Sequence, residues 1–194
     1  DAAEEDTSGE PGLDGSSASD QMRLPLERDL GAVSLWPEVQ KLFGHNTEIY
    51  CLASVANGDS VLVASSAKAR EVEDAAIRLW NVLEGKCVQI LLGGHKSTVT
   101  TMNFSSSGRY LVSSGKDRRL CLWKRGEREF TLAWAKDSAH KRIVWSVHFC
   151  PFDESILASG SRDGCIKIWK IVDDDNATQL FSFAPSFTRN EKPD

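Results

Sequence analysis

Three sets of residues recur together along this sequence, and they constrain its fold more than any other feature. Trp80, Trp123 and Trp169 each close a short run of alternating apolar and polar residues, and they lie 43 and 46 residues apart. An aspartate stands six residues before each tryptophan, at Asp74, Asp117 and Asp163. Two markers that recur together at nearly the same spacing indicate internal structural repeats of about 40–50 residues.

Histidines supply the third marker. His45, His95 and His140 lie 50 and 45 residues apart, and the first two follow a glycine. Four residues after each histidine a β-branched residue opens a strand-like run, at Ile49, Val99 and Val144. The runs are short, rich in Val, Ile, Leu, Phe and Trp, and separated by Gly, Ser, Asn and Asp. This pattern predicts an all-β protein built of repeated units that pack against one another.

Composition separates the first 35 residues from the rest. Residues 1–35 hold nine acidic and two basic side chains and few aromatic or β-branched ones, so we expect an acidic disordered linker or tail there. We expect a second tail at 185–194. The residues after 35 hold 21 bases and 19 acids, which is not the basic balance of a nucleic-acid-binding domain. No run approaches the roughly 18–20 apolar residues of a membrane span, so we expect no membrane contact.

The five cysteines of the chain are widely spaced and include no C-x-x-C pair. Each lies in or beside an apolar run, so we interpret them as small buried side chains in a reducing compartment, not as zinc ligands or a disulfide framework. We therefore expect a cytoplasmic protein, with the nucleus left open as a second location.

The repeats resemble the WD40 family of β-propellers, whose units of about 40–45 residues carry Gly-His and Trp-Asp signatures. The resemblance covers roughly residues 36–184. It implies three four-stranded blades near 45–92, 95–135 and 140–184, plus a leading strand at 36–43, within a larger seven-bladed ring. Three blades cannot close a ring, so we expect the natural protein to be longer and the isolated chain to aggregate.

In the WD40 family a histidine, a serine or threonine, an aspartate and the closing tryptophan of each blade form a hydrogen-bonded network. Such a network satisfies polar groups that would each cost about 1–3 kcal/mol if buried unpaired. The first blade is the least regular, because residues 67–75 are an insertion. The implied structural tetrads are His45, Ser65, Asp74 and Trp80; His95, Ser113, Asp117 and Trp123; and His140, Ser159, Asp163 and Trp169.

A Ser-His-Asp hydrolase is the rival interpretation of these sets, but it needs one set in one pocket with an oxyanion hole. Three copies of the same set favour a structural role. Once they are set aside, no cluster of His, Cys or carboxylates remains, and no glycine-rich phosphate loop or H-E-x-x-H motif occurs. The sequence therefore predicts no catalytic residues, no cofactor and no metal site.

Segments outside the generic repeat resemble a narrower family, the WD40 subunits of the Elongator complex. The lead-in Trp36-Pro37-Glu38, the insertion and its flank at 67–77, and the run from His140 to Val147 carry this resemblance. It implies a non-catalytic scaffold of two seven-bladed propellers that docks the catalytic radical SAM and acetyltransferase subunit and the large scaffold subunit. The implied process is tRNA wobble-uridine modification, with transcription elongation as a further association. The alternative is a WD40 interaction module of another complex, such as a ubiquitin-ligase substrate receptor.

Contacts with partners are expected from charged and aromatic side chains beside the histidine loops and aspartate turns, because arginine and aromatic residues supply most interface energy. The candidates are Lys68, Arg70, Lys116, Arg118, Lys141, Arg142, Trp145 and Arg162. Ordinary solvated turn residues, with Trp145 packed between blades, remain the alternative. Residues 115–142 also hold nine bases against four acids, which would give a weak tRNA contact if those bases shared a face.

Overall fold

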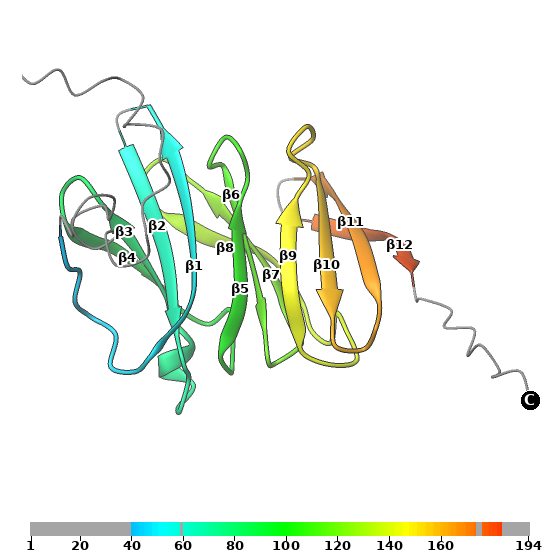
Figure 1. Cartoon of the computed structure of the whole chain (residues 1–194). Helices are drawn as coiled ribbons and strands as arrows, with labels where there is room; N and C mark the ends of the chain where they lie inside the picture. The colour runs from blue at the N-terminus through cyan, green and yellow to red at the C-terminus, as the bar shows by residue number, and fades with distance from the viewer. Residues whose placement is uncertain (1–39, 59, 174–175, 184–194) are drawn as a thin grey trace, which may run out of the picture. The chain divides into compact units, whose positions relative to one another are not determined.

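The computed structural model of the 194-residue chain describes residues 40–183 apart from residues 59 and 174–175 (Figure 1). The strands form three four-stranded antiparallel sheets, and within each sheet the strands follow one another in chain order. The expected tails, 1–35 and 185–194, lie outside the described residues. No helix in the described part of the chain is long and apolar enough to cross a membrane.

Each sheet is one blade of the predicted all-β architecture. Blade 1 contains β1 (Ile49–Asn57), β2 (Ser60–Ala67), β3 (Ile77–Asn81) and β4 (Lys86–Leu91), with a short 3-10 turn η3 (Glu73–Ala75) between β2 and β3. Blade 2 contains β5 (Val99–Phe104), β6 (Tyr110–Gly115), β7 (Leu120–Arg125) and β8 (Phe130–Lys136). Blade 3 contains β9 (Val144–Phe149), β10 (Ile156–Ser161), β11 (Ile166–Asp173) and β12 (Asn176–Phe183).

The core lies between the blades, and burial along the strands reflects this. All six residues of β6 are buried, because blade 2 packs on both of its faces. In β9 the pattern alternates instead: Val144, Val147 and Phe149 join the core shared with blade 2, whereas the residues between them are exposed. Trp134 of blade 2 packs edge-on against Trp169 of blade 3, with ring centroids 5.9 Å apart.

Hydrogen bonds also join neighbouring blades along their inner strands, β1, β5 and β9, which lie side by side in Figure 1. Cys51 Sγ of β1 donates to the Val99 carbonyl of β5 at 3.6 Å, and Ser66 Oγ of the adjacent β2 donates to the same carbonyl at 3.1 Å. From blade 3, the backbone amide of Val147 donates to Thr101 Oγ1 at 3.1 Å and that of Phe149 donates to Asn103 Oδ1 at 2.9 Å. Because the partner residue number rises from 101 to 103 in β5 as it rises from 147 to 149 in β9, the two strands are parallel.

The outer faces of blades 1 and 3 carry exposed apolar side chains. Leu52 on β1 is 62% exposed, and Phe181 on β12 is 60% exposed. The three sheets therefore form an incomplete propeller whose two end faces lack a neighbouring blade within the described residues.

The predicted leading strand, 36–43, is wrong in its described part. Residues 40–43 adopt no regular structure, and 36–39 lie outside the described residues. A strand needs a neighbouring strand to satisfy its backbone N–H and C=O groups. The ladders of blade 1 pair β1 to β4 with one another and include no residue of 40–43.

Candidate functional site

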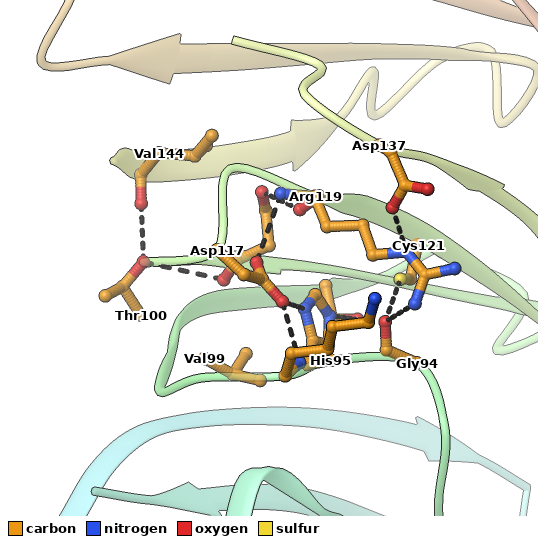
Figure 2. Close-up of polar contacts among 12 residues, drawn as sticks. Gly94, His95, Val99, Thr100, Asp117, Arg119, Cys121, Asp137 and Val144 are labelled. Carbon is orange, nitrogen blue, oxygen red and sulfur yellow. Dashed lines mark hydrogen bonds and ion pairs between the residues drawn. The ribbon is translucent and has the colours of Figure 1, made fainter. Parts of the chain in front are cut away.

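Blade 2 contains a continuous hydrogen-bonded chain from its tryptophan to its aspartate. Trp123 Nε1 donates to Ser113 Oγ at 2.8 Å, and Ser113 Oγ lies 2.8 Å from His95 Nε2. His95 Nδ1 lies 2.9 Å from Asp117 Oδ2, a contact drawn in Figure 2. Because the ionised Asp117 carboxylate can only accept, Nδ1–H donates to it, and Nε2 of the neutral tautomer accepts the Ser113 hydroxyl proton. The structure thus brings together the four residues of this predicted set.

Blade 3 repeats the arrangement. Trp169 Nε1 donates to Ser159 Oγ at 2.8 Å, Ser159 Oγ lies 2.7 Å from His140 Nε2, and His140 Nδ1 lies 3.2 Å from Asp163 Oδ2. Burial by itself would raise the pKa of Asp163. Hydrogen bonds from the backbone amides of Cys165 and Lys141 and from His140 outweigh burial and lower this pKa to about 2. The aspartate is therefore an ionised acceptor at neutral pH.

Blade 1 holds only part of its predicted set. His45 Nε2 lies 2.6 Å from Ser65 Oγ, and Trp80 Nε1 donates to the same oxygen at 2.7 Å. Asp74 is the exception, and its predicted place in this tetrad is wrong. Its Oδ2 accepts the backbone amides of Arg70 and Glu71, at 3.1 and 3.2 Å. In the described part of the chain no hydrogen bond joins His45 to Asp74.

The insertion explains the displaced aspartate. Four residues, 116–119, connect β6 to β7, and 162–165 connect β10 to β11, whereas 68–76 connect β2 to β3. The longer connection forms η3, and Asp74 lies within it. Its carboxylate holds the turn that precedes η3, as aspartates commonly do at such positions.

Arg119, which is outside the predicted sets, secures the loop of blade 2. Arg119 Nη1 donates to the carbonyls of Gly93 and Gly94, at 3.2 and 2.7 Å, and Nε lies 2.8 Å from Asp137 Oδ1 (Figure 2). Gly94 is confined by the tryptophan, since a Cβ there would lie 2.2 Å from Trp123 Cζ2. No sequence pattern distinguishes Arg119 from the adjacent Arg118, so this role has no signal in the sequence.

The loops that carry the candidate partner contacts all lie at one end of the sheets. This end, called the loop rim below, consists of the loops before β1, β5 and β9 and the connections β2–β3, β6–β7 and β10–β11. Seven of the eight candidates lie in these loops, and Trp145 is the second residue of β9. On the loop rim, the exposed candidates are Lys68, Arg70, Arg118, Lys141, Arg142, Trp145 and Arg162.

Three candidates show how the rim side chains are engaged. Trp145 is 51% exposed, so the alternative in which it packs between blades is wrong in this structure. Lys116 is half-buried, with its Nζ 5.0 Å from the ring centroid of Tyr50. Lys68 lies 3.5 Å from Glu48 Oε1 in an exposed ion pair, which contributes little to stability.

The basic stretch 115–142 does not form one surface. Lys116 and Arg118 precede β7 at the loop rim, whereas Arg125 ends β7 and Arg128 follows it at the opposite end. A strand of this length spans roughly 20 Å, because each residue rises about 3.3 Å. The bases are therefore divided between the two ends of blade 2.

The cysteines are all unpaired, and their burial varies. Cys121 is buried and burial raises its pKa to about 12, but Cys87 is exposed, so the prediction of burial is wrong for Cys87. Among the described residues no group of three or more His, Cys, Asp and Glu side chains could hold a metal ion.

Each repeat is a meander of four strands with a hydrogen-bonded Trp-Ser-His chain, and these two features define the class of protein. The sequence matches the family description "WD domain, G-beta repeat" over residues 36–81, 85–124 and 132–170. The chain belongs to the WD40 repeat family. Its fold resembles the crystal structure of the RRP9 WD40 repeats with a TM-score of 0.60 and 25% identity, covering 74% of this chain and 40% of that one. The structure of U3-55K gives the same score and identity.

Curated relatives of this chain are named Elongator complex protein 2. The chain is 38% identical to the protein of that name from Schizosaccharomyces pombe over 180 residues, which cover 86% of this chain and 23% of the relative. It is 39% identical to the human protein over 155 residues, covering 75% of this chain and 18% of the relative. The chain thus spans less than a quarter of the length of these relatives.

Proposed function

We propose that this chain is part of a non-catalytic WD40 scaffold subunit of the Elongator complex and that its loop rim docks other subunits. The observation that carries the proposal is the relationship to proteins named Elongator complex protein 2, at 34–41% identity in organisms from yeasts to plants and mammals. Through that complex the protein would support tRNA wobble-uridine modification in the cytoplasm, with the nucleus as a second location.

The loop rim supports a docking role on physical grounds. It gathers exposed arginines with a half-exposed tryptophan, the residue types that most often anchor protein interfaces. Buried hydrogen bonds hold the loops beside them, as His95 and Asp117 do on blade 2. Loops that are already ordered lose less conformational freedom on binding.

The test is affinity purification of the tagged full-length protein from its own cells, with mass spectrometry of the proteins that co-purify. We expect the radical SAM and acetyltransferase subunit and the large scaffold subunit. Recovery of a ubiquitin-ligase assembly instead would refute the proposal and support the alternative module.

A matched pair of variants tests the rim itself. Lys141→Glu with Arg142→Glu reverses two exposed charges on the loop rim, and Lys86→Glu with Arg128→Glu reverses two exposed charges at the opposite end. We expect the first pair to lower recovery of a docked subunit at least about tenfold, which corresponds to roughly 1.4 kcal/mol, and the second pair to leave it unchanged. Equal losses from both pairs would contradict docking by the rim.

A further inference from the structure

Blade 1 has a cavity where blades 2 and 3 hold an aspartate. Its volume is about 190 Å³, and it opens at the loop rim beside His45. Its lining includes His45, Asn46, Glu73, Asp74 and Arg78. The cavity exists because the insertion draws Asp74 away to the amides of Arg70 and Glu71.

Blades 2 and 3 show what the corresponding position binds. In each, one aspartate oxygen contacts the histidine Nδ1 and also accepts the backbone amide of the next residue. Lys96 N donates to Asp117 Oδ2 at 3.0 Å, and Lys141 N donates to Asp163 Oδ2 at 2.8 Å. Two donors therefore converge on one carboxylate oxygen in both blades.

Blade 1 retains the same two donors. With a carboxylate bound at Nδ1, His45 would carry its imidazole proton there and accept the Ser65 hydroxyl proton at Nε2, the arrangement that Asp117 and Asp163 impose in blades 2 and 3. Burial and the nearby Arg78 lower the pKa of His45, so the imidazole is neutral at pH 7 and Nδ1–H is a neutral donor. The amide of Asn46 is the second donor. Within the described residues no hydrogen bond occupies either one.

Arg78 adds a positive charge to the cavity. Its Nη1 lies 3.5 Å from where a Cβ on Gly44 would stand, next to His45. The cation at the equivalent position of blade 3 already has an acceptor, since Lys167 Nζ donates to the Ala139 carbonyl at 2.6 Å, and blade 2 has Cys121 at this position. Arg78 has no hydrogen bond or ion pair within the described part of the chain. Its guanidinium is free to form the charge-assisted hydrogen bonds that favour a carboxylate.

We propose that this cavity binds an aspartate or glutamate side chain of another polypeptide, which completes the tetrad of blade 1 from outside the chain. Two neighbouring carboxylates of the chain are engaged elsewhere, since Glu48 pairs with Lys68 and Asp74 holds its own turn, and within the described residues no hydrogen bond or ion pair joins Glu73 to His45 or Arg78. Glu73 and Asp74 also line the cavity, and their charges oppose a dianionic phosphate more strongly than a single carboxylate. The inference rests on the proposed docking role only for the identity of the polypeptide.

The test converts the ion pair into a covalent bond. The full-length protein carrying Arg78→Lys, which keeps the positive charge, is purified from its own cells with its partners and treated with a zero-length carbodiimide. This reagent converts a carboxyl group into an O-acylisourea, and the introduced amine attacks its acyl carbon to form an amide with release of the urea derived from the carbodiimide. The native Lys68–Glu48 pair, 3.5 Å apart, reports successful coupling in the same sample. Arg78→Gln, which has no amine, is the matched negative control.

We expect mass spectrometry to find a cross-link from position 78 to an aspartate or glutamate of another polypeptide, absent from the Arg78→Gln sample. Cross-links from position 78 only to Glu73, Asp74 or the acidic residues of 1–35 would overturn the proposal. The proposal would also fail if position 78 formed no cross-link in a sample in which Lys68 and Glu48 were coupled. A cross-link to a polypeptide outside the Elongator complex would support the site and refute the proposed function. Recovery of Elongator subunits without an intermolecular cross-link at position 78 would refute the site and support the proposed function.

Discussion

Replacing the aspartates of the three blades by alanine should produce unequal effects, although the sequence places them at equivalent positions. Asp117 accepts hydrogen bonds from His95 Nδ1 and from the backbone amides of Lys96 and Arg119, at 2.9–3.1 Å. The loss of three such bonds, with the buried histidine left unpaired, should destabilise by about 2–4 kcal/mol. Asp74→Ala removes two exposed bonds to a turn, which should destabilise by less than about 1 kcal/mol.

Urea unfolding of the full-length protein, followed by tryptophan fluorescence, measures the difference. Asp117→Ala should lower the urea midpoint of the transition of this propeller several times more than Asp74→Ala does, because it loses several times more free energy of unfolding. Asp163→Ala should resemble Asp117→Ala, because it loses the same kinds of bond. Equal midpoints for Asp74→Ala and Asp117→Ala would contradict the finding that Asp74 lies away from His45. They would also contradict the cavity that this displacement leaves beside His45.

Four further outcomes follow from the structure. In the native protein Asp163 contributes stability that is lost as the pH falls from about 4 to about 2, because its folded-state pKa of about 2 lies below the ordinary 3.8. The melting temperature of Asp163→Asn should therefore depend less on pH in this range. Gly94→Ala should lower the melting temperature by several degrees, since its Cβ would overlap an indole ring, whereas Gly160→Ala, with open space around its Cβ, should not. Maleimide should label exposed Cys87 in the native protein and buried Cys121 only after unfolding, as peptide mapping would show. The isolated 194-residue chain should elute as aggregates in size-exclusion chromatography because its end blades expose apolar faces, and a monodisperse, cooperatively melting chain would contradict this.

Most of the fold could be predicted because repetition makes weak signals reinforce one another. The spacing of Trp80, Trp123 and Trp169 set the repeat length, and alternation within each run placed the strands. The tetrads of blades 2 and 3 could be anticipated residue by residue, since their connections between the second and third strands are equally short. Local pattern and three-dimensional arrangement agree in these blades.

The contacts of Asp74 and Arg119 could not be predicted, because they depend on the path of a lengthened loop and on the direction of a single side chain. Asp74 keeps the spacing to its tryptophan, yet the insertion before it supplies Arg70 and Glu71 amides that compete for the carboxylate. Arg118 and Arg119 are adjacent and chemically identical, but one is exposed and the other reaches into the loop of blade 2. Sequence spacing carries no information about such choices, because they depend on contacts between residues far apart in the chain.

The position of the tetrads has a consequence for how this surface can diversify. His140 and Asp163 fix the two loops of blade 3 from below, and the exposed Lys141 and Arg162 are their immediate neighbours in the chain. A substitution at either exposed position changes charge and shape at the rim but leaves the anchoring hydrogen bonds in place. Substitutions at positions 141 and 162 can therefore change what the rim binds with little loss of folding stability. The framework of the blades stays stable while their binding surface evolves.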